Sequence, residues 1–203
     1  MSFADMTVRE FVEELSTDSA TPGGGSGAAI AGAMGAALGE MVCNLTIGKD
    51  DFEDVEDDMA AARETLEGHR ERLLDLADED SAAFDELMAA YRTPEDEGKA
   101  EAIEEASKTA AEVPLETAEE CLAVIEESID VAKKGNPHSV TDAGTAALLA
   151  HAALESALYN VEINLGSIDD EDFCAEMESK TDELVEAADD ALAEVQDAVD
   201  ANL

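Results

Sequence analysis

Apolar residues recur at alternating spacings of three and four along the stretch from Asp51 to Tyr91. This spacing puts them on one face of a helix, so the stretch predicts one long helix packed against other helices. The seam consists of Phe52, Val55, Met59, Ala62, Leu66, His69, Leu73, Leu76, Asp80, Ala83, Leu87 and Ala90. Two seam positions, His69 and Asp80, are polar.

The segments before the long helix carry helix-start signals. Thr7 and Glu10 are spaced as a capping box, which predicts a short helix to about Leu15. A glycine loop over residues 21–27 then leads into a helix that ends near Ile47. In that helix a stripe of small residues recurs every fourth position and predicts the close approach of another helix. The stripe is Gly27, Ala31, Gly35 and Gly39.

Further helices follow the long one. Thr93 and Pro94 predict a new helix with a cap and a proline in its first turn. Pro114 is expected to break or kink the helix that follows, and a further helix stops at Gly135 after Lys134. The loop 135–142 leads into an Ala-rich helix up to residue 165, and an acidic amphipathic helix covers roughly residues 169–201.

No stretch alternates in the manner of a β-strand. The sequence therefore predicts an all-α fold, a bundle of five to six main helices in one domain over residues 1–203. Apolar residues make up 45% of the chain, which excludes a disordered acidic tail. The uncharged segment 23–39 is too short and too rich in Gly and Ala for a membrane span, so we expect a buried helix.

The charge balance narrows the class of partner. The chain has 52 acidic and 11 basic residues, a formal charge of -41 spread along its length. Molar salt would screen the resulting repulsion, which favours adaptation to brine. A DNA mimic or acidic binding tail would cluster its charge, whereas here acids alternate with apolar helix positions. Nucleic-acid binding needs a basic patch, and none is visible.

The cysteines and histidines favour a reduced cytoplasm and no metal. Cys43, Cys121 and Cys174 are far apart, and no His, Cys and carboxylate set has zinc-ligand spacing. No secretory signal peptide is visible at the start. Of the histidines, His69 is expected in the core or an interface, and His151 is expected in the core. His138 lies in a loop, where it either contacts a ligand or has no special role.

Asp80 is the strongest candidate for chemistry. Most acids of this chain can remain in water, so an acid on an apolar seam needs a reason. Burial raises the pKa of a carboxyl group unless a cation lies nearby, and such a group suits a general base or a cationic substrate. The alternative is that the helix bends near Asp80 and leaves it exposed.

The glycine loop and three lysines are further candidates. The loop matches neither a P-loop nor a dinucleotide fingerprint, but N–H groups at the following helix start could meet a flat or anionic ligand. Close helix packing is the alternative. The two unusual loops are flanked by Lys49, Lys133 and Lys134, which could bind an anionic tail such as glutamate. Alternatively, these lysines only interact favourably with the dipole at helix C-termini. Asp142 at a helix start reads equally well as an N-cap.

Five stretches, in this order, resemble the cyclodeaminase and methenyltetrahydrofolate cyclohydrolase family, which includes the C-terminal half of formiminotransferase-cyclodeaminase. They are TPGGGSGAAIAGAMGAALGEMVCNLTIGK (21–49), DEDSAAF (78–84), VPLETA (113–118), GNPHSVTDAGTAALLAHAA (135–153) and NVEINL (160–165). The glycine and TDAG stretches are specific in combination. Thr141 stands where relatives often carry serine.

The resemblance implies an all-helical homodimer that binds folate near subunit or helix junctions. It maps the family's catalytic carboxylate onto Asp80, in agreement with the seam. It also implies a folate-binding set formed by Gly24, Gly25, Ser26, Asn44, Lys49, Asn136, Asp142 and Asn164. No cofactor beyond the tetrahydrofolate substrate and no metal are implied.

Two reactions occur in this family. A cyclohydrolase converts 5,10-methenyltetrahydrofolate to 10-formyltetrahydrofolate, whereas a cyclodeaminase closes formiminotetrahydrofolate to the methenyl form and expels ammonia. We expect the cyclohydrolase, because this chain has no room for a formiminotransferase domain. A non-catalytic acidic helical dimer is the alternative from another class. It would leave the glycine loop, the Asn136 loop and Asp80 unexplained.

Overall fold

The computed structural model describes residues 2–203, which form six α-helices and four short 3-10 helices and no β-strand. The predicted all-α fold is confirmed. In chain order the elements are η1 (Phe3–Asp5), α1 (Val8–Leu15), α2 (Gly24–Thr46), η2 (Asp50–Phe52), α3 (Glu56–Ala90), η3 (Glu95–Glu97), α4 (Lys99–Lys134), η4 (Pro137–Ser139), α5 (Val140–Leu165) and α6 (Glu171–Asn202).

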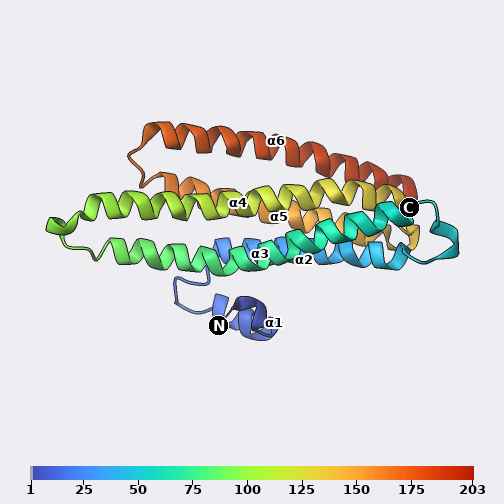
Figure 1. Ribbon diagram of the computed structural model, residues 1–203, viewed down its shortest axis with the longest axis horizontal. Helices are drawn as coiled ribbons and strands as arrows, with labels where there is room; N and C mark the ends of the chain where they lie inside the picture. The colour runs from blue at the N-terminus through green and yellow to red at the C-terminus, as the bar shows by residue number, and fades with distance from the viewer. Residues whose placement is uncertain (1) are drawn as a thin grey trace.

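Helices α2 to α5 form an elongated four-helix bundle, and α6 covers α4 and α5 on one side (Figure 1). The short α1 lies outside the bundle beside α3. It begins at the predicted capping box of Thr7 and Glu10. The N-terminal segment is attached to the bundle by the N–H of Phe3, which donates to Asp78 Oδ1 at 2.8 Å.

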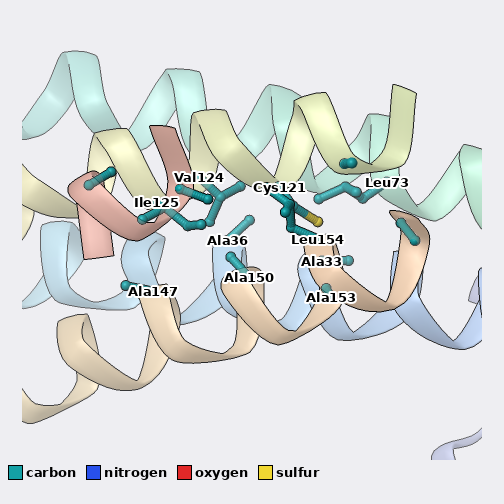
Figure 2. Close-up of a cluster of buried hydrophobic side chains, with 14 of the residues drawn as sticks. Ala33, Ala36, Leu73, Cys121, Val124, Ile125, Ala147, Ala150, Ala153 and Leu154 are labelled. Carbon is teal, nitrogen blue, oxygen red and sulfur yellow. The ribbon is translucent and has the colours of Figure 1, made fainter. Parts of the chain in front are cut away.

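The bundle core combines small side chains from two helices with larger ones from the other two (Figure 2). Helices α2 and α5 contribute mainly alanine, so their backbones come close together. Helices α3 and α4 fill the remaining space with Leu, Val, Ile and the thiol of Cys121. The labelled side chains are Ala33, Ala36, Leu73, Cys121, Val124, Ile125, Ala147, Ala150, Ala153 and Leu154.

Glycines spaced seven apart, rather than four apart, set the approach of α2 to α3. A Cβ atom built on any of three glycines would crowd an α3 side chain that is itself seven residues from the next. The facing pairs are Gly25 with Asp80, Gly32 with Leu73, and Gly39 with Leu66. A Cβ on Gly32 would also lie 2.6 Å from Cys121 Sγ of α4, nearer than Leu73. This antiparallel register repeats every two turns, as in heptad packing.

The predicted stripe with a spacing of four is therefore wrong as a single contact line. Gly27 has open space around it, and Gly39 faces α3. Gly35 faces α5 instead, where a Cβ would lie 2.8 Å from the carbonyl oxygen of Ala146. Because α2 lies between two helices, its small residues fall on two separate lines.

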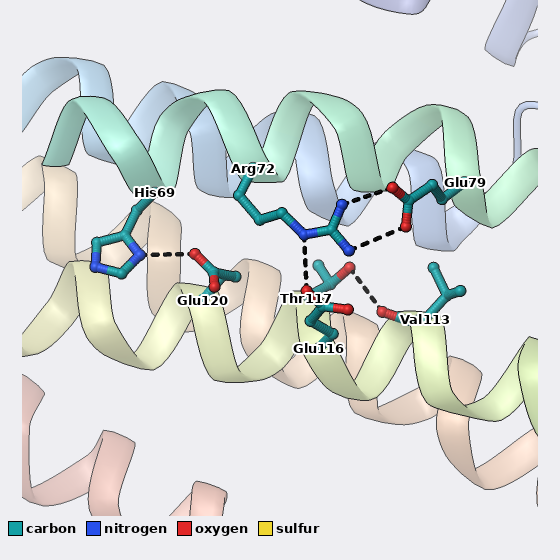
Figure 3. Close-up of polar contacts among 7 residues, drawn as sticks. All are labelled: His69, Arg72, Glu79, Val113, Glu116, Thr117 and Glu120. Atoms are coloured by element: carbon teal, nitrogen blue, oxygen red, sulfur yellow. Dashed lines mark hydrogen bonds and ion pairs between the residues drawn. The ribbon is translucent and has the colours of Figure 1, made fainter. Parts of the chain in front are cut away.

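A ladder of ion pairs fixes α4 against α3 (Figure 3). His69 Nδ1 lies 2.6 Å from Glu120 Oε2, and Arg72 Nε donates to Glu116 Oε1 at 2.7 Å. Arg72 also holds Glu79 through both terminal nitrogens. His69, a polar position of the α3 seam, thus makes a contact between two helices, as the sequence predicted for an interface histidine.

Pro114 does not break α4, which is continuous from Lys99 to Lys134. A proline has no N–H, so the carbonyl of Ala110 four residues earlier lacks its usual helical donor. Asn164 of α5 replaces that donor, because its Nδ2 donates to Ala110 O at 2.5 Å. The expected break is avoided by a hydrogen bond from a neighbouring helix.

Helix boundaries also differ from the predicted ones. Helix α2 begins at Gly24, so most of the expected glycine loop is its first turn. The long helix begins at Glu56, because residues 50–52 form a 3-10 turn. Helix α4 begins at Lys99, after Gly98 in the left-handed region (φ 79°), rather than at Pro94. Glycine adopts that conformation at no steric cost, which explains the restart there.

Helix α2 is long and apolar enough, by length and composition, to cross a membrane. Half of its most apolar window is buried inside the bundle, against α3, α4 and α5. This packing agrees with the buried helix expected from its Gly and Ala content.

Candidate active site

Asp80 lies on the buried side of α3, level with the first turn of α2. Its Oδ2 accepts two hydrogen bonds from Ser26, one from the backbone N–H and one from Oγ, each 2.8 Å long. The Asp80 side chain is half-buried and directed toward α2, unlike the solvated acids around it. The seam position thus corresponds to an inward-facing carboxyl group.

The first turn of α2 is built to receive this carboxylate. Gly23, the N-cap residue, has no side chain to satisfy the free N–H groups of the helix start. Asp80 supplies the missing acceptor from another helix, at the position a capping side chain normally occupies. Gly25 leaves room for it, since a Cβ there would lie 2.6 Å from Asp80 Cγ. The positive end of the helix dipole adds to the attraction.

The pKa of Asp80 is raised, and burial is the main cause. The two hydrogen bonds from Ser26 lower that pKa and offset part of the effect. Burial disfavours the charged form, while N–H and O–H donors favour it. The result is a carboxyl group with more affinity for protons than its exposed counterparts, as acid–base chemistry near neutral pH requires.

An apolar groove of about 390 Å³ runs between α2 and α5 and begins at Gly24. Its lining carries no charged residue, and its polar groups come from Ser156, Tyr159 and Asn160. Asn160 lies beside Gly24, about 3.5 Å from the position of a Cβ there. Asp80 does not line this groove in a single chain, because the first turn of α2 separates them.

A second group of predicted site residues lies at the other end of the bundle. From Ser26 to Asn44, helix α2 rises by roughly 27 Å at about 1.5 Å per residue. Asn136 is fixed there by its N–H, which donates to Thr46 Oγ1 at 2.9 Å, and by Nδ2, which donates to Leu45 O. One chain therefore does not bring the whole predicted set together.

The lysines differ in their availability for an anionic ligand. Lys133 pairs with Glu194, and Lys134 pairs with both Asp58 and Asp130. Lys49 is exposed, and within residues 2–203 it makes no ion pair. Of the three, Lys49 is free to meet a carboxylate of a ligand.

Other predicted residues have structural roles as well. Asp142 lies in the first turn of α5, so it is not the N-cap, a position taken by Ser139. Asn164 serves Ala110, as described above. His138, predicted in a loop, lies in η4 and is exposed. His151, expected in the core, instead pairs with Asp189 of α6 at 2.8 Å.

The two buried thiols offer no nucleophile. Burial raises the pKa of Cys43 to about 11 and raises that of Cys121 still further. Thiolate is the reactive form of cysteine, so both groups are inert near neutral pH.

The formiminotransferase-cyclodeaminase family model matches residues 7–183, from the start of α1 into α6. The chain belongs to the formiminotransferase-cyclodeaminase family. Methenyltetrahydrofolate cyclohydrolase from Methylorubrum extorquens is 45% identical over 84% of this chain and 84% of its own length. The crystal structure of formiminotetrahydrofolate cyclodeaminase from Thermotoga maritima superposes with a TM-score of 0.91 at 33% identity, covering 98% of both chains.

Longer members of this family match as well. Formimidoyltransferase-cyclodeaminase from Sus scrofa is 32% identical over 96% of this chain, which spans 37% of that protein. The chain thus spans little more than a third of such two-function relatives. Its match to the Thermotoga maritima cyclodeaminase nevertheless extends over almost all of both chains.

A larger pocket of about 640 Å³ lies between α5 and α6. Four carboxylates line it, those of Glu155, Glu162, Glu178 and Asp182, and no basic residue does. A folate with an anionic glutamate tail would be repelled there. For a member of the formiminotransferase-cyclodeaminase family, the region around Asp80 and the first turn of α2 is the better candidate, although the groove on the other side of that turn is smaller.

Sequence reasoning missed Ser81 and Asn160 at this site. Ser81 Oγ lies 3.1 Å from Ser26 Oγ, and Asn160 lies beside Gly24. Both belong to stretches that carry the resemblance to the formiminotransferase-cyclodeaminase family, DEDSAAF and NVEINL. The periodicity of the helices could not have found them, because neither is an apolar seam position.

Proposed function

We propose that this chain is a methenyltetrahydrofolate cyclohydrolase that converts 5,10-methenyltetrahydrofolate and water to 10-formyltetrahydrofolate. The observation that carries the proposal is Asp80, an inward-facing carboxyl group with a raised pKa and two fixed donors on one oxygen. The 45% identity with the cyclohydrolase of Methylorubrum extorquens supports the same reaction.

The chemistry follows from the charge of the substrate. The methenyl bridge between N5 and N10 is cationic, so the Asp80 carboxylate attracts it and lies ready to accept a proton. A water oxygen bonds to the bridge carbon while Asp80 removes one of its protons. Asp80 then gives this proton to N5 as the bond between N5 and the bridge carbon breaks. The second water proton leaves to solvent as the formyl C=O forms.

Cyclodeamination is the second candidate, supported by the Thermotoga maritima cyclodeaminase, which matches along 98% of both chains. That match removes chain length as a reason to prefer one reaction, so the expectation from length does not distinguish them. In this reaction N10 attacks the formimino carbon. The N10 proton and one proton from protonated Asp80 pass to the formimino nitrogen, and the bond between that nitrogen and the carbon breaks to release ammonia. Higher identity with the cyclohydrolase keeps that reaction first.

Separate substrates distinguish the two reactions. Purified protein in molar KCl is given methenyltetrahydrofolate, with loss of methenyl absorbance as the readout, and then formiminotetrahydrofolate, with ammonia as the readout. We expect hydrolysis of the first. Ammonia release from the second alone would reverse the assignment. Absence of both reactions, together with no folate binding in a titration, would favour the non-catalytic scaffold.

Asp80→Asn tests the residue that carries the reaction. The amide keeps the size and can still accept from Ser26, so we expect a folded protein that loses at least about 10²-fold in turnover. Asp85→Asn on the exposed side of α3 is the matched control and should turn over normally. Normal turnover by Asp80→Asn would remove this residue from the mechanism.

We also propose that the site is completed by a second copy of the chain. Exposed apolar side chains on α2 and α5 form one face, including Met34 (57% exposed), Leu148 and Ile163 (74%). An antiparallel pairing of α2 with its copy, centred near Met34, would bring Ser26 of one chain level with Asn44 of the other. Such two-fold contacts are the commonest in homo-oligomers.

Mixed dimers test this arrangement. We expect Asp80→Asn and Lys49→Glu chains to be inactive or weak alone, whereas a mixed dimer would contain one site with both natural residues. Random mixing should restore about a quarter of natural turnover, because half of the dimers are mixed and each has one intact site. Activity equal to the sum of the two variants would place Lys49 outside the Asp80 site.

A charge placed on the proposed interface provides a second test. Met34→Glu should give monomers by sedimentation in molar KCl, with loss of turnover. Val185→Glu, at an apolar α6 position that is also partly exposed, should remain dimeric. A dimeric Met34→Glu protein would contradict the interface.

We propose a cytoplasmic, salt-adapted enzyme that needs no metal or cofactor beyond its folate substrate. The formal charge of -41 supports adaptation to salt.

A further inference from the structure

A chain of hydrogen bonds leads from Asp80 to a residue without an assigned role. Ser26 Oγ lies 2.8 Å from Asp80 Oδ2 and 3.1 Å from Ser81 Oγ. Ser26 is fully buried, so its hydroxyl has no access to water as a substitute partner. Ser81 is half-buried next to it. The three side chains form one connected unit.

The direction of these hydrogen bonds follows from counting protons. An ionised carboxylate only accepts, so the single hydroxyl proton of Ser26 points to Asp80. Ser26 Oγ is then left as an acceptor, and Ser81 must donate to it. The backbone N–H of Ser26 also donates to Oδ2, which favours placing any added proton on the other oxygen, Oδ1.

Ser81 does not make the bond that a helical serine or threonine usually makes. Thr117 and Ser128 donate to the carbonyl four residues earlier in their own helix, at 3.2 and 2.7 Å. The hydroxyl of Ser81 instead reaches across to α2. This choice is evidence that its contact with Ser26 matters to the site.

We propose that Ser81 is a positioning residue, which orients the Ser26 hydroxyl toward Asp80 Oδ2 and so reserves Oδ1 for proton exchange with the substrate. The proposal rests on the function proposed for Asp80. Hydrogen bonds in a chain polarise one another, so the Ser81 donor strengthens the bond that Ser26 makes. Loss of Ser81 should therefore weaken the hold on Oδ2 without removing the carboxylate.

Neighbouring charged groups do not explain the raised pKa of Asp80. On α3 its neighbours Asp78 and Glu79 are engaged by Phe3 N–H and Arg72. On α2 the sequence has no charge between residues 18 and 40. At this level of the bundle, α4 carries Lys108, which is paired with Asp170, and the exposed Glu112.

On α5 the acids that flank Asn160 are Glu155 and Glu162, both exposed. No charged group contributes to the raised pKa of Asp80, which depends on burial and on Ser26 alone. Changes in the hydrogen bonds should therefore dominate any change in its titration.

The test measures the pKa of Asp80 directly. Carboxyl carbon NMR titration of the substrate-free protein gives the pKa of Asp80, and the pH profile of kcat gives its value during turnover. Ser81→Ala should raise both by about half to one pH unit, the size of one net hydrogen bond. At pH values below the pKa of Asp80, kcat of Ser81→Ala should be about three- to tenfold lower than that of the natural protein, with little change in KM. Ser81→Thr keeps the hydroxyl and should restore the natural profile.

Ser107→Ala is the matched control, because Ser107 is a buried helical serine whose hydroxyl has no partner among the described residues. It should leave the titration unchanged. In a Ser26→Ala background, Ser81→Ala should add no further shift, since Ser81 acts through Ser26.

Two results would overturn the proposal: an unchanged titration in Ser81→Ala, or an equal shift with and without Ser26. The NMR titration needs no turnover, so it remains informative if Asp80→Asn shows that the proposed reaction is wrong.

Discussion

Gly25→Ala is expected to disable the site while leaving the fold intact. The new Cβ would lie 2.6 Å from Asp80 Cγ, whereas ordinary contacts begin near 3.4 Å. The carboxylate must therefore retreat by at least about 0.8 Å, the difference between these distances, because its Oδ1 lies closer still to the new Cβ. Both bonds to Ser26 are 2.8 Å long, and a retreat of this size stretches them beyond useful range.

The expected loss of turnover is on the order of 10²-fold, the typical effect of moving a catalytic group by about 1 Å. The stability of the fold should change little. Alanine gains up to about 1 kcal/mol of helix propensity over glycine, and weakening the Asp80 cap costs about the same. The expected result is therefore a large loss of turnover in a protein whose free energy of unfolding is nearly unchanged.

The assay is turnover of saturating methenyltetrahydrofolate in molar KCl, with a circular-dichroism melt of the same sample. Gly68→Ala is the control, because Gly68 lies in the interior of α3 with open space around it. It should turn over normally and gain up to about 1 kcal/mol of stability. Natural turnover by Gly25→Ala would refute the close approach of Asp80 to α2.

Three other outcomes are expected. Asn164→Ala should cost about 1–3 kcal/mol by leaving the Ala110 carbonyl unpaired. Most of that cost should vanish in a Pro114→Ala background, where the helical N–H is restored; equal urea-unfolding losses in both backgrounds would contradict this. Glu120 raises the pKa of His69, so their pair should stabilise the fold fully below about pH 6.5 and lose this effect as pH rises through the raised pKa. Urea unfolding of His69→Gln should lack that pH dependence. Lowering KCl from molar to about 0.1 M should lower the melting temperature, because the Debye length grows from about 3 to 10 Å; an unchanged melt would count against salt adaptation.

The helices of this fold could be predicted from the sequence because their apolar residues recur at regular helical spacings. The seam of α3 predicted the buried positions from Met59 to Ala90. Its polar member Asp80 was correctly singled out as inward-facing. Boundaries were less accurate where short 3-10 turns and Gly98 intervene, since these features depend on local backbone geometry more than on periodicity.

The glycine pattern shows where periodicity alone fails. Spacings of four and of seven are both present in α2, and each corresponds to a helical face. Only the positions of the neighbouring helices decide that Gly39 meets α3, Gly35 meets α5 and Gly32 meets both α3 and α4. A sequence does not state how many neighbours surround a helix.

The sequence predicted a set of site residues but not where they lie along the bundle. Resemblance grouped Ser26 with Asn44 and Lys49, although α2 separates them by most of its length. Asn164 and Pro114 were assigned independently, as a ligand contact and a helix breaker. Their shared partner, the Ala110 carbonyl, was invisible until three-dimensional contacts were known.

The glycines of α2 also affect the order in which the molecule assembles. Six of them lie within the helix, at positions 24, 25, 27, 32, 35 and 39, and each one in the helix interior costs about 1 kcal/mol of intrinsic helix stability relative to alanine. In isolation this segment has little tendency to form a helix, so we expect it to become helical only when α3 and α5 already lie beside it. Because the donors for Asp80 arise with that final docking step, a half-folded chain would carry the acid but not the means to orient it.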